Sequence, residues 1–300
     1  MNWLNHLLAA MLTAFAVPAM AALNIFACEP EWGSLAKELG GDKANVYVAT
    51  TALQDPHRIE ARPSLIARAR TADLVVCTGA ELEIGWMPLV QTQSGNPKIQ
   101  SGQPGYFEAT RQLTLIDVPQ RLDRALGDVH AAGNPHVHLD PSNIATVAAA
   151  LAERMAQLDP GAAEQYRARA RTFLERWQQA RVRWEKEGAA LKGMPIVVYH
   201  RDMSYLVRWL GLREVGSLEP KPGIPPTASH LSELLANLGR DPASAVVRSA
   251  YADPRAAQWL SERAKIPALV LPFTVGGSER AKDLFGLFDD TLARLRAVAK

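Results

Sequence analysis

Short β-type runs alternate with helical stretches in two separate parts of the chain, and this alternation constrains its fold more than any other feature. The first part has such runs at residues 23–28, 45–50 and 72–79, and the second has them at 195–200, 244–251 and 267–273. Strands that alternate with helices form parallel sheets built from βαβ units. We therefore expect an α/β fold with two lobes, each with a mainly parallel sheet flanked by helices.

A long linker helix is expected between the two parts. Residues 160–191 have no interior proline, are rich in Ala, Arg, Glu and Gln, and carry large apolar residues at spacings near three, four and seven. Such a helix would be about 45 Å long. Pro160 suits a first helical turn, and Gly193 lies beyond the far end. The chain is thereby divided into an N-terminal lobe at 22–159, the helix, and a C-terminal lobe at 192–300.

The first 21 residues have the pattern of a signal peptide. A short apolar run is followed by Ala19-Met20-Ala21, which offers small residues at the cleavage positions. The run is too short to span a bilayer, which argues against a membrane anchor. We therefore expect cleavage before Ala22 and a mature protein in the periplasm.

Two cysteines, Cys28 and Cys77, each end an expected strand. An oxidising compartment permits them to pair, and the sulfurs would be close if the two strands are neighbours. A bridge between adjacent parallel strands is geometrically demanding, so two buried free thiols are the alternative.

The charge balance indicates no nucleic-acid partner. Lys and Arg total 33 against 31 Asp and Glu, which gives a formal net charge of +2. Arginines between 167 and 183 are interleaved with glutamates at helical spacing, which is typical of a solvated helix face and not of a basic patch.

Three of the seven histidines occupy comparable places in the expected fold. His57 follows the run at 45–50, His200 ends the run at 195–200, and His136 lies in a proline-flanked loop directly before a helix. Parallel-sheet folds bind ligands at the carboxyl edges of their strands. Neutral imidazole suits zinc, which takes three or four protein ligands in a tetrahedral site. These histidines therefore predict a zinc site.

Neighbouring residues give further candidates for this site. Asp55 and Asp140 can accept the hydrogen bonds that fix imidazole tautomers, with loop or helix capping as their alternative role. His138 would point away from His136 in an extended segment. His130 lies in a flexible-looking loop nearby and is a candidate auxiliary ligand.

Five segments, in this order, resemble the periplasmic solute-binding proteins that serve zinc and manganese importers of the ATP-binding-cassette type. They are DPHRIEARPS (55–64), GAELEIGW (79–86), GNPHVHLDP (133–141), VVYHRDMSYLVRWLGL (197–212) and LEPKPGIPPTASHL (218–231). The resemblance implies two α/β lobes joined by a single long helix, with the metal bound between them by His57, His136 and His200. Manganese members usually have a carboxylate at the position of His200, and nitrogen donors favour zinc.

Two departures from the family pattern concern the metal ligands. Family members commonly supply an Asp from a late loop of the second lobe, but residues 271–285 have no Asp at the expected place. The candidates for the fourth ligand are Glu60, Glu279, His138, Asp283 or a water molecule, with water or a nearby carboxylate favoured. Many zinc members also carry a long His-rich loop before the second histidine motif, where this chain has only His130.

The resemblance implies a carrier that captures Zn²⁺ and delivers it to an ABC-type metal permease in the inner membrane. We expect a monomer, with a periplasmic metallochaperone as a further candidate partner. The alternatives are a Mn²⁺ or Fe²⁺ carrier of the same fold, a binding module for an organic ligand, and a zinc-dependent hydrolase with Glu60 as general base. The chain has no HExxH motif, which argues against the hydrolase.

Overall fold

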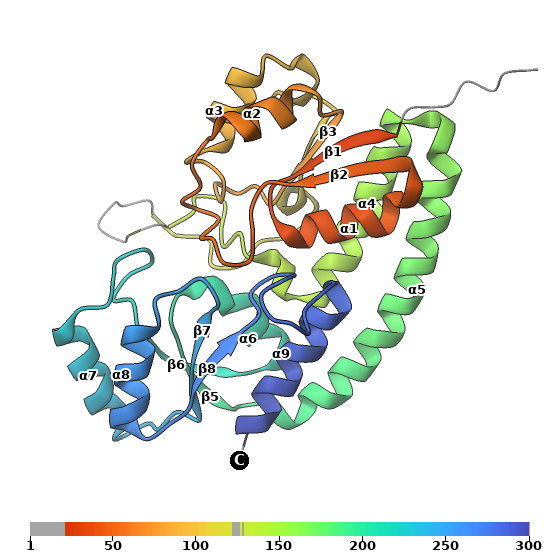
Figure 1. Ribbon diagram of the computed structural model, residues 1–300. Helices are drawn as coiled ribbons and strands as arrows, with labels where there is room; N and C mark the ends of the chain where they lie inside the picture. The colour runs from red at the N-terminus through yellow and green to blue at the C-terminus, as the bar shows by residue number, and fades with distance from the viewer. Residues whose placement is uncertain (1–21, 122–126, 128, 300) are drawn as a thin grey trace, which may run out of the picture.

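The computed structural model describes residues 22–121, 127 and 129–299, so the expected signal peptide lies outside the described residues. Two α/β lobes are stacked one above the other, with a long helix along one side of both (Figure 1). Within the described part of the chain, no helix is long and apolar enough to cross a membrane.

The N-terminal lobe contains a parallel sheet of four strands in the order β2-β1-β3-β4. The strands are β1 (Leu23–Ala27), β2 (Ala44–Val48), β3 (Leu74–Cys77) and β4 (Tyr106–Glu108), and the helices around them are α1 (Pro30–Gly40), α2 (Pro63–Arg70), α3 (Met87–Ser94) and α4 (Pro141–Leu158). Each of these helices has a proline in its first turn, where the missing N–H breaks no helical hydrogen bond.

Helices cover both faces of this sheet because successive strand residues point to opposite sides. Ile25 and Val76 pack in one core cluster with α1 and α4. Phe26 and Val75 pack in another with α2 and α3. Burial on both faces explains why the central strands read as nearly continuous apolar runs.

The C-terminal lobe repeats this plan with a second parallel sheet in the order β6-β5-β7-β8. Its strands are β5 (Pro195–Val198), β6 (Arg213–Ser217), β7 (Ala245–Ser249) and β8 (Ala268–Leu271), and its helices are α6 (Ser204–Leu210), α7 (Ala228–Leu238), α8 (Pro254–Ala264) and α9 (Leu284–Val298). The expected fold class, with two parallel sheets flanked by helices, is confirmed.

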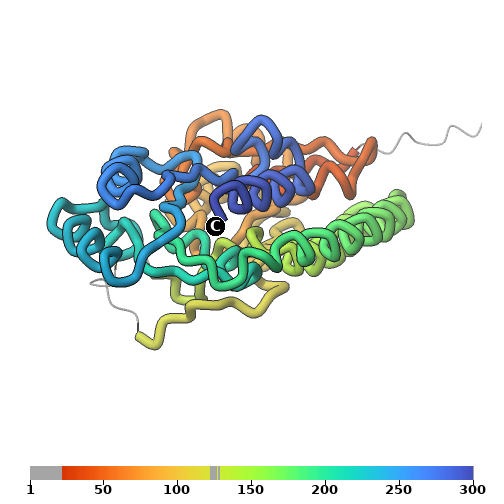
Figure 2. The backbone as a smooth tube through the Cα atoms, turned by 90° about the horizontal axis from the view of Figure 1, so that it is seen from below, coloured from red at the N-terminus to blue at the C-terminus, as the bar shows by residue number. Residues whose placement is uncertain are grey.

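The long helix α5 (Ala163–Gly188) connects the lobes, and 3-10 turns at 160–162 and 189–191 extend it at both ends. In the view from below (Figure 2), its green rod runs from the middle of the molecule to the end where the red first elements lie. Its buried face carries Tyr166, Phe173, Trp177 and Trp184, at spacings of seven, four and seven. These residues therefore form one apolar stripe along α5, and the stripe faces both lobes.

Two tryptophans of α5 bind the helix to both lobes. Trp177 Nε1 donates to the carbonyl of Pro141 at the start of α4, and Trp184 Nε1 donates to Asp289 in α9. Both indoles also pack against Phe288 of α9, at ring-centroid distances of 5.5 Å and 5.0 Å. A single core cluster consequently runs from the first sheet through α5 into the second lobe.

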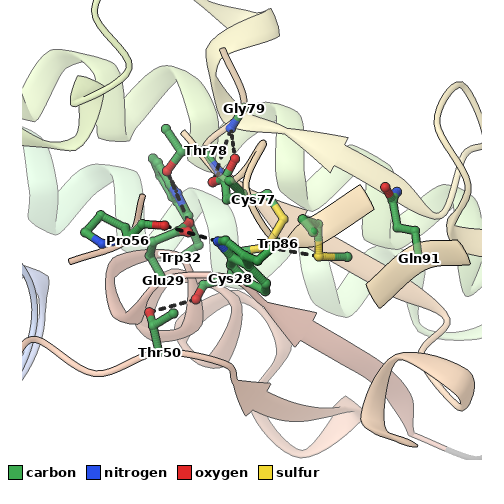
Figure 3. The surroundings of a disulfide bond; sticks show 12 residues. Cys28, Glu29, Trp32, Thr50, Pro56, Cys77, Thr78, Gly79, Trp86 and Gln91 are labelled. Atoms are coloured by element: carbon green, nitrogen blue, oxygen red, sulfur yellow. Dashed lines mark hydrogen bonds between the residues drawn. A yellow bond between two sulfur atoms is a disulfide. The ribbon is translucent and has the colours of Figure 1, made fainter. Parts of the chain in front are cut away.

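Cys28 and Cys77 are joined by a disulfide (Figure 3). The register of β1 and β3 pairs Ala27 with Val76, which places the next two residues opposite each other at a Cα–Cα distance of 4.8 Å. This separation is within the range that a disulfide spans. The bond crosses the carboxyl end of the first sheet.

The tryptophan contacts predict that α5 stabilises the whole molecule. Trp177→Ala should lower the free energy of unfolding by about 3–5 kcal/mol, because it leaves a cavity where a fully buried indole lay. Val182→Ala, on the exposed side of the same helix, should change it by less than about 0.5 kcal/mol. Chemical denaturation measures both values, and equal stability of the two variants would contradict the role of α5.

Candidate metal centre

Three imidazoles from separate segments converge at the boundary between the lobes. His57 lies in the loop that follows β2, His136 in the loop before α4, and His200 shortly after β5. One ring nitrogen of each lies within 4.8 Å of those of the other two. The ring centroids are 5.4 Å, 6.0 Å and 5.8 Å apart. His57, after β2, and His200, after β5, thus lie close together, and His136 lies close to both.

The Nδ1 atom of each of these rings contacts an oxygen acceptor. The pairs are His57 with Asp55 at 2.8 Å, His136 with Asn134 at 2.8 Å, and His200 with Glu219 at 2.6 Å. Because carboxylate and amide oxygens only accept hydrogen bonds, each Nδ1 carries the proton and each Nε2 keeps its lone pair. Acceptors that hold imidazoles in one tautomer and orientation are typical of metal-ligating histidines.

Two of the three acceptors lie in the same local motif. In Asp55-Pro56-His57 and in Asn134-Pro135-His136, one side-chain oxygen accepts both the backbone N–H of the histidine, at 3.0 Å, and its Nδ1–H. The intervening proline restricts the backbone of the turn. Each ring is therefore fixed within three residues of chain.

His136 presents a buried nitrogen without a partner. Its Nε2 has no hydrogen bond although it is buried, and the residue is only 2 % exposed. Burial lowers the pKa of His136 well below its usual value, and the imidazoles of His57 and His200 lower it further. The ring is therefore neutral near pH 7, and a neutral buried nitrogen with a free lone pair suits a metal ion.

His200 differs in its electrostatic surroundings. Burial acts to lower its pKa, but the hydrogen bond that its ring donates to Glu219 and the charge of Asp202 outweigh this effect, so the pKa is raised. A proton therefore competes with a metal ion more strongly at His200 than at His136.

A cavity of about 220 Å³ borders His57 and His200. It is lined by Asp55, His57 and Arg58 from the N-terminal lobe, and by Tyr199, His200, Asp202, Glu219 and Tyr251, among others, from the C-terminal lobe. Several carboxylates in this lining favour entry of a cation.

The remaining sequence-based candidates lie in different places. His138 is fully buried, with Nε2 2.9 Å from the carbonyl oxygen of Phe273 and Nδ1 3.2 Å from Glu31, so it faces away from the three rings. Glu60 and Glu279 are exposed and outside the group of converging ligand atoms. His130 is also outside this group, but its Nε2 is 3.3 Å from Nε2 of His57.

Asp140 does not take the acceptor role expected for it. Its side chain caps α4 through the N–H of Ser142 and pairs with Arg208 at 3.1 Å. The acceptors at the second and third rings are Asn134 and Glu219, which sequence reasoning missed. The repeated Asx-Pro-His pattern could have pointed to Asn134, whereas Glu219 is brought to His200 only by the pairing of β5 with β6.

A second group with metal-binding side chains lies at the end of the first sheet. It consists of Cys28, Cys77 and Glu83. The two sulfurs are bonded to each other, which removes them as ligands. The three converging imidazoles are therefore the better candidate metal centre.

Comparison with known proteins relates most of the chain to metal-uptake proteins. Residues 25–298 match the family model described as zinc-uptake complex component A, periplasmic (ZnuA). The zinc-binding lipoprotein AdcA of Streptococcus pneumoniae is 23 % identical over 239 residues, which cover 78 % of this chain and 46 % of AdcA. The high-affinity zinc uptake system protein ZnuA of Paracoccus denitrificans is 22 % identical over 282 residues, covering 83 % of this chain and 82 % of that protein.

A solved structure shares the fold. The crystal structure of a ZnuA superposes with a TM-score of 0.74 at 20 % identity and covers 93 % of this chain and 97 % of that one. The chain spans about half the length of AdcA.

The geometry predicts that the oxygen of Asp55, and not its charge, orients His57. Asp55→Ala should weaken zinc binding by about 10- to 100-fold, the usual cost of losing a partner behind a ligand. Asp55→Asn should weaken it much less, because it reproduces the arrangement that Asn134 already makes at His136. Zinc titration against a competing chelator measures both variants, and equal losses in the two would show that the hydrogen bond is not what matters.

Proposed function

The chain belongs to the family of periplasmic zinc-uptake components, and on this premise we propose that it captures Zn²⁺ between its two lobes and delivers the ion to a metal importer of the ABC type. The proposed ligands are His57, His136 and His200. The observation that carries the proposal is the convergence of three imidazoles, each with Nδ1 on an oxygen acceptor, around a buried and unpartnered Nε2 of His136.

Zinc fits this donor set better than manganese does. Three imidazole nitrogens suit zinc, whereas carboxylate, carbonyl and water oxygens suit manganese. The carboxylates nearest the rings, Asp55 and Glu219, contact the Nδ1 atoms and support the rings from behind.

The division of the ligands between the lobes supports a carrier role. His57 and His136 belong to the N-terminal lobe, and His200 follows the first strand of the C-terminal lobe. A shift of one lobe against the other would remove His200 from the ion and leave only ligands from the N-terminal lobe. The continuous core through α5 opposes such a shift, so release would need docking on the permease.

A zinc hydrolase is less well supported. It would need a general base within hydrogen-bond reach of a metal-bound water. Glu60, the carboxylate considered for this role, is exposed and outside the ligand group. The family consists of transport components, and we propose that this chain is not an enzyme.

The proposed setting is the periplasm, with export by a cleaved signal peptide, a monomeric state and an inner-membrane permease as partner. A periplasmic metallochaperone is a candidate supplier of the ion.

The test is zinc titration of metal-stripped mature protein under manganese competition. The parent should bind one zinc ion, and His57→Ala, His136→Ala and His200→Ala should each weaken zinc binding by more than about 100-fold. This loss should exceed that from removing a residue that only supports a ligand, which is about 10- to 100-fold. His230→Ala is the matched control, since His230 contacts the carbonyl of Ser217 outside the ligand group.

Three outcomes would contradict the proposal. They are absence of zinc binding, binding that is indifferent to the three histidines, and a preference for manganese. Steady zinc-dependent turnover of an ester or peptide substrate would favour the hydrolase.

A further inference from the structure

The turn at residues 79–86, which joins β3 to α3, has an unusual backbone. Gly79, Ala80 and Glu81 have φ values of 83°, 49° and 68°. Left-handed conformations cost energy for residues with a side chain, and among the described residues only Asp117 and Lys265 share this feature with Ala80 and Glu81. Such strain persists only where the surroundings fix it, and it is frequent at functional sites.

Glu83 fixes the start of this turn. Its carboxylate accepts the backbone N–H groups of Thr78 at 2.7 Å and of Gly79 at 3.0 Å. The side chain is buried, so these bonds are shielded from water.

The far end of the turn holds the segment that carries His57. Trp86 Nε1 donates to the carbonyl oxygen of Pro56 at 3.1 Å (Figure 3). Gly85 lies so close to this segment that a Cβ atom there would be 3.2 Å from the carbonyl oxygen of His57. The turn thus supports the segment that carries His57, one of the proposed zinc ligands.

The left-handed part of the turn, at residues 79–81, contacts the segment that carries His130. Glu81 accepts the backbone N–H of Ala131 at 2.8 Å, a contact between residues fifty positions apart. The neighbouring His130 places its Nε2 3.3 Å from Nε2 of His57, and its ring centroid lies 5.3 Å from that of His57 and 6.4 Å from that of His136.

The separation of the Nε2 atoms of His57 and His130 matches coordination of one ion by both rings, while His130 is not in the group whose ring nitrogens all lie within 4.8 Å of one another, so its ring has to approach His136 and His200 when the ion binds. With zinc–nitrogen bonds of 2.0–2.1 Å, the nitrogens of a tetrahedral site are about 3.3–3.4 Å apart. His57 Nδ1 donates to Asp55, so the atom of His57 that faces His130 is its ligand nitrogen.

We propose that His130 is the fourth zinc ligand and that Glu81 is the residue that positions it. The inference rests on the proposed function and assigns the position for which sequence reasoning favoured water or a carboxylate. The segment at 79–86 then positions both rings, because Trp86 contacts the segment that carries His57 and Glu81 contacts the segment that carries His130.

The experiment measures zinc affinity and the visible spectrum of the Co²⁺-substituted protein for the parent, His130→Ala, Glu81→Ala, Glu81→Gln and Glu60→Ala. His130→Ala should weaken zinc binding by about 10- to 100-fold and change the Co²⁺ bands, and added free imidazole should restore the parental spectrum. Glu81→Ala should weaken binding by up to about tenfold, and Glu81→Gln, which keeps an acceptor oxygen, should recover it. Thermal unfolding of the metal-free variants checks that each one folds.

The outcomes separate this inference from the carrier role. If the parent binds no zinc, the proposed function fails. If the parent binds zinc through His57, His136 and His200 but His130→Ala leaves both affinity and spectrum unchanged, only the fourth-ligand assignment is overturned. Loss of affinity in Glu60→Ala instead of His130→Ala would assign the position to a carboxylate and overturn it as well.

Discussion

The proposed metal centre depends on a hydrogen-bonding arrangement that occurs twice, in which one side-chain oxygen accepts hydrogen bonds from both the backbone N–H and the ring of a histidine two residues later. Asp55 does this for His57 and Asn134 does it for His136. The arrangement decides the tautomer, because the oxygen accepts at Nδ1 and leaves Nε2 free. A neutral amide and a charged carboxylate fill the same role, so the geometry of the acceptor and not its charge is the shared element. Two of the proposed ligands are thereby pre-oriented locally, which lowers the ordering cost of binding an ion.

The position of the third proposed ligand depends on long-range packing. His200 follows β5 in the other lobe, and its acceptor Glu219 comes from the segment after the neighbouring strand β6. Its distance from the other two rings is set by how the lobes are held together, which is the role of α5 and its contacts with α4 and α9. Proposed ligands on both lobes suit an ion that is captured between the lobes and released when they move. The packing that keeps the site assembled is also what a permease would have to disturb.

The alternation of apolar runs and helical stretches was enough to predict the two parallel sheets, because central strands buried on both faces leave a clear signal. The edge strands β4 and β6 were missed, since β4 has three residues and β6 contains Arg213, Glu214 and Gly216. The three converging histidines were found from their places after strands and in a proline-bounded loop. His130 was a candidate from its place near His136, whereas Glu219 and Glu81 make their contacts with distant segments, which no local pattern encodes. Asp140 shows the opposite case, since it was expected to accept from an imidazole, and it takes the alternative role of capping α4 instead.

X-ray absorption at the zinc edge of the loaded mature protein tests the central claim most directly, because it reports the atoms bound to the ion. Our account predicts a first shell of nitrogen or oxygen at about 2.0–2.1 Å, with the outer-shell scattering of at least three imidazole rings. A shell with sulfur at about 2.3 Å, or one with fewer than three imidazoles, would contradict it.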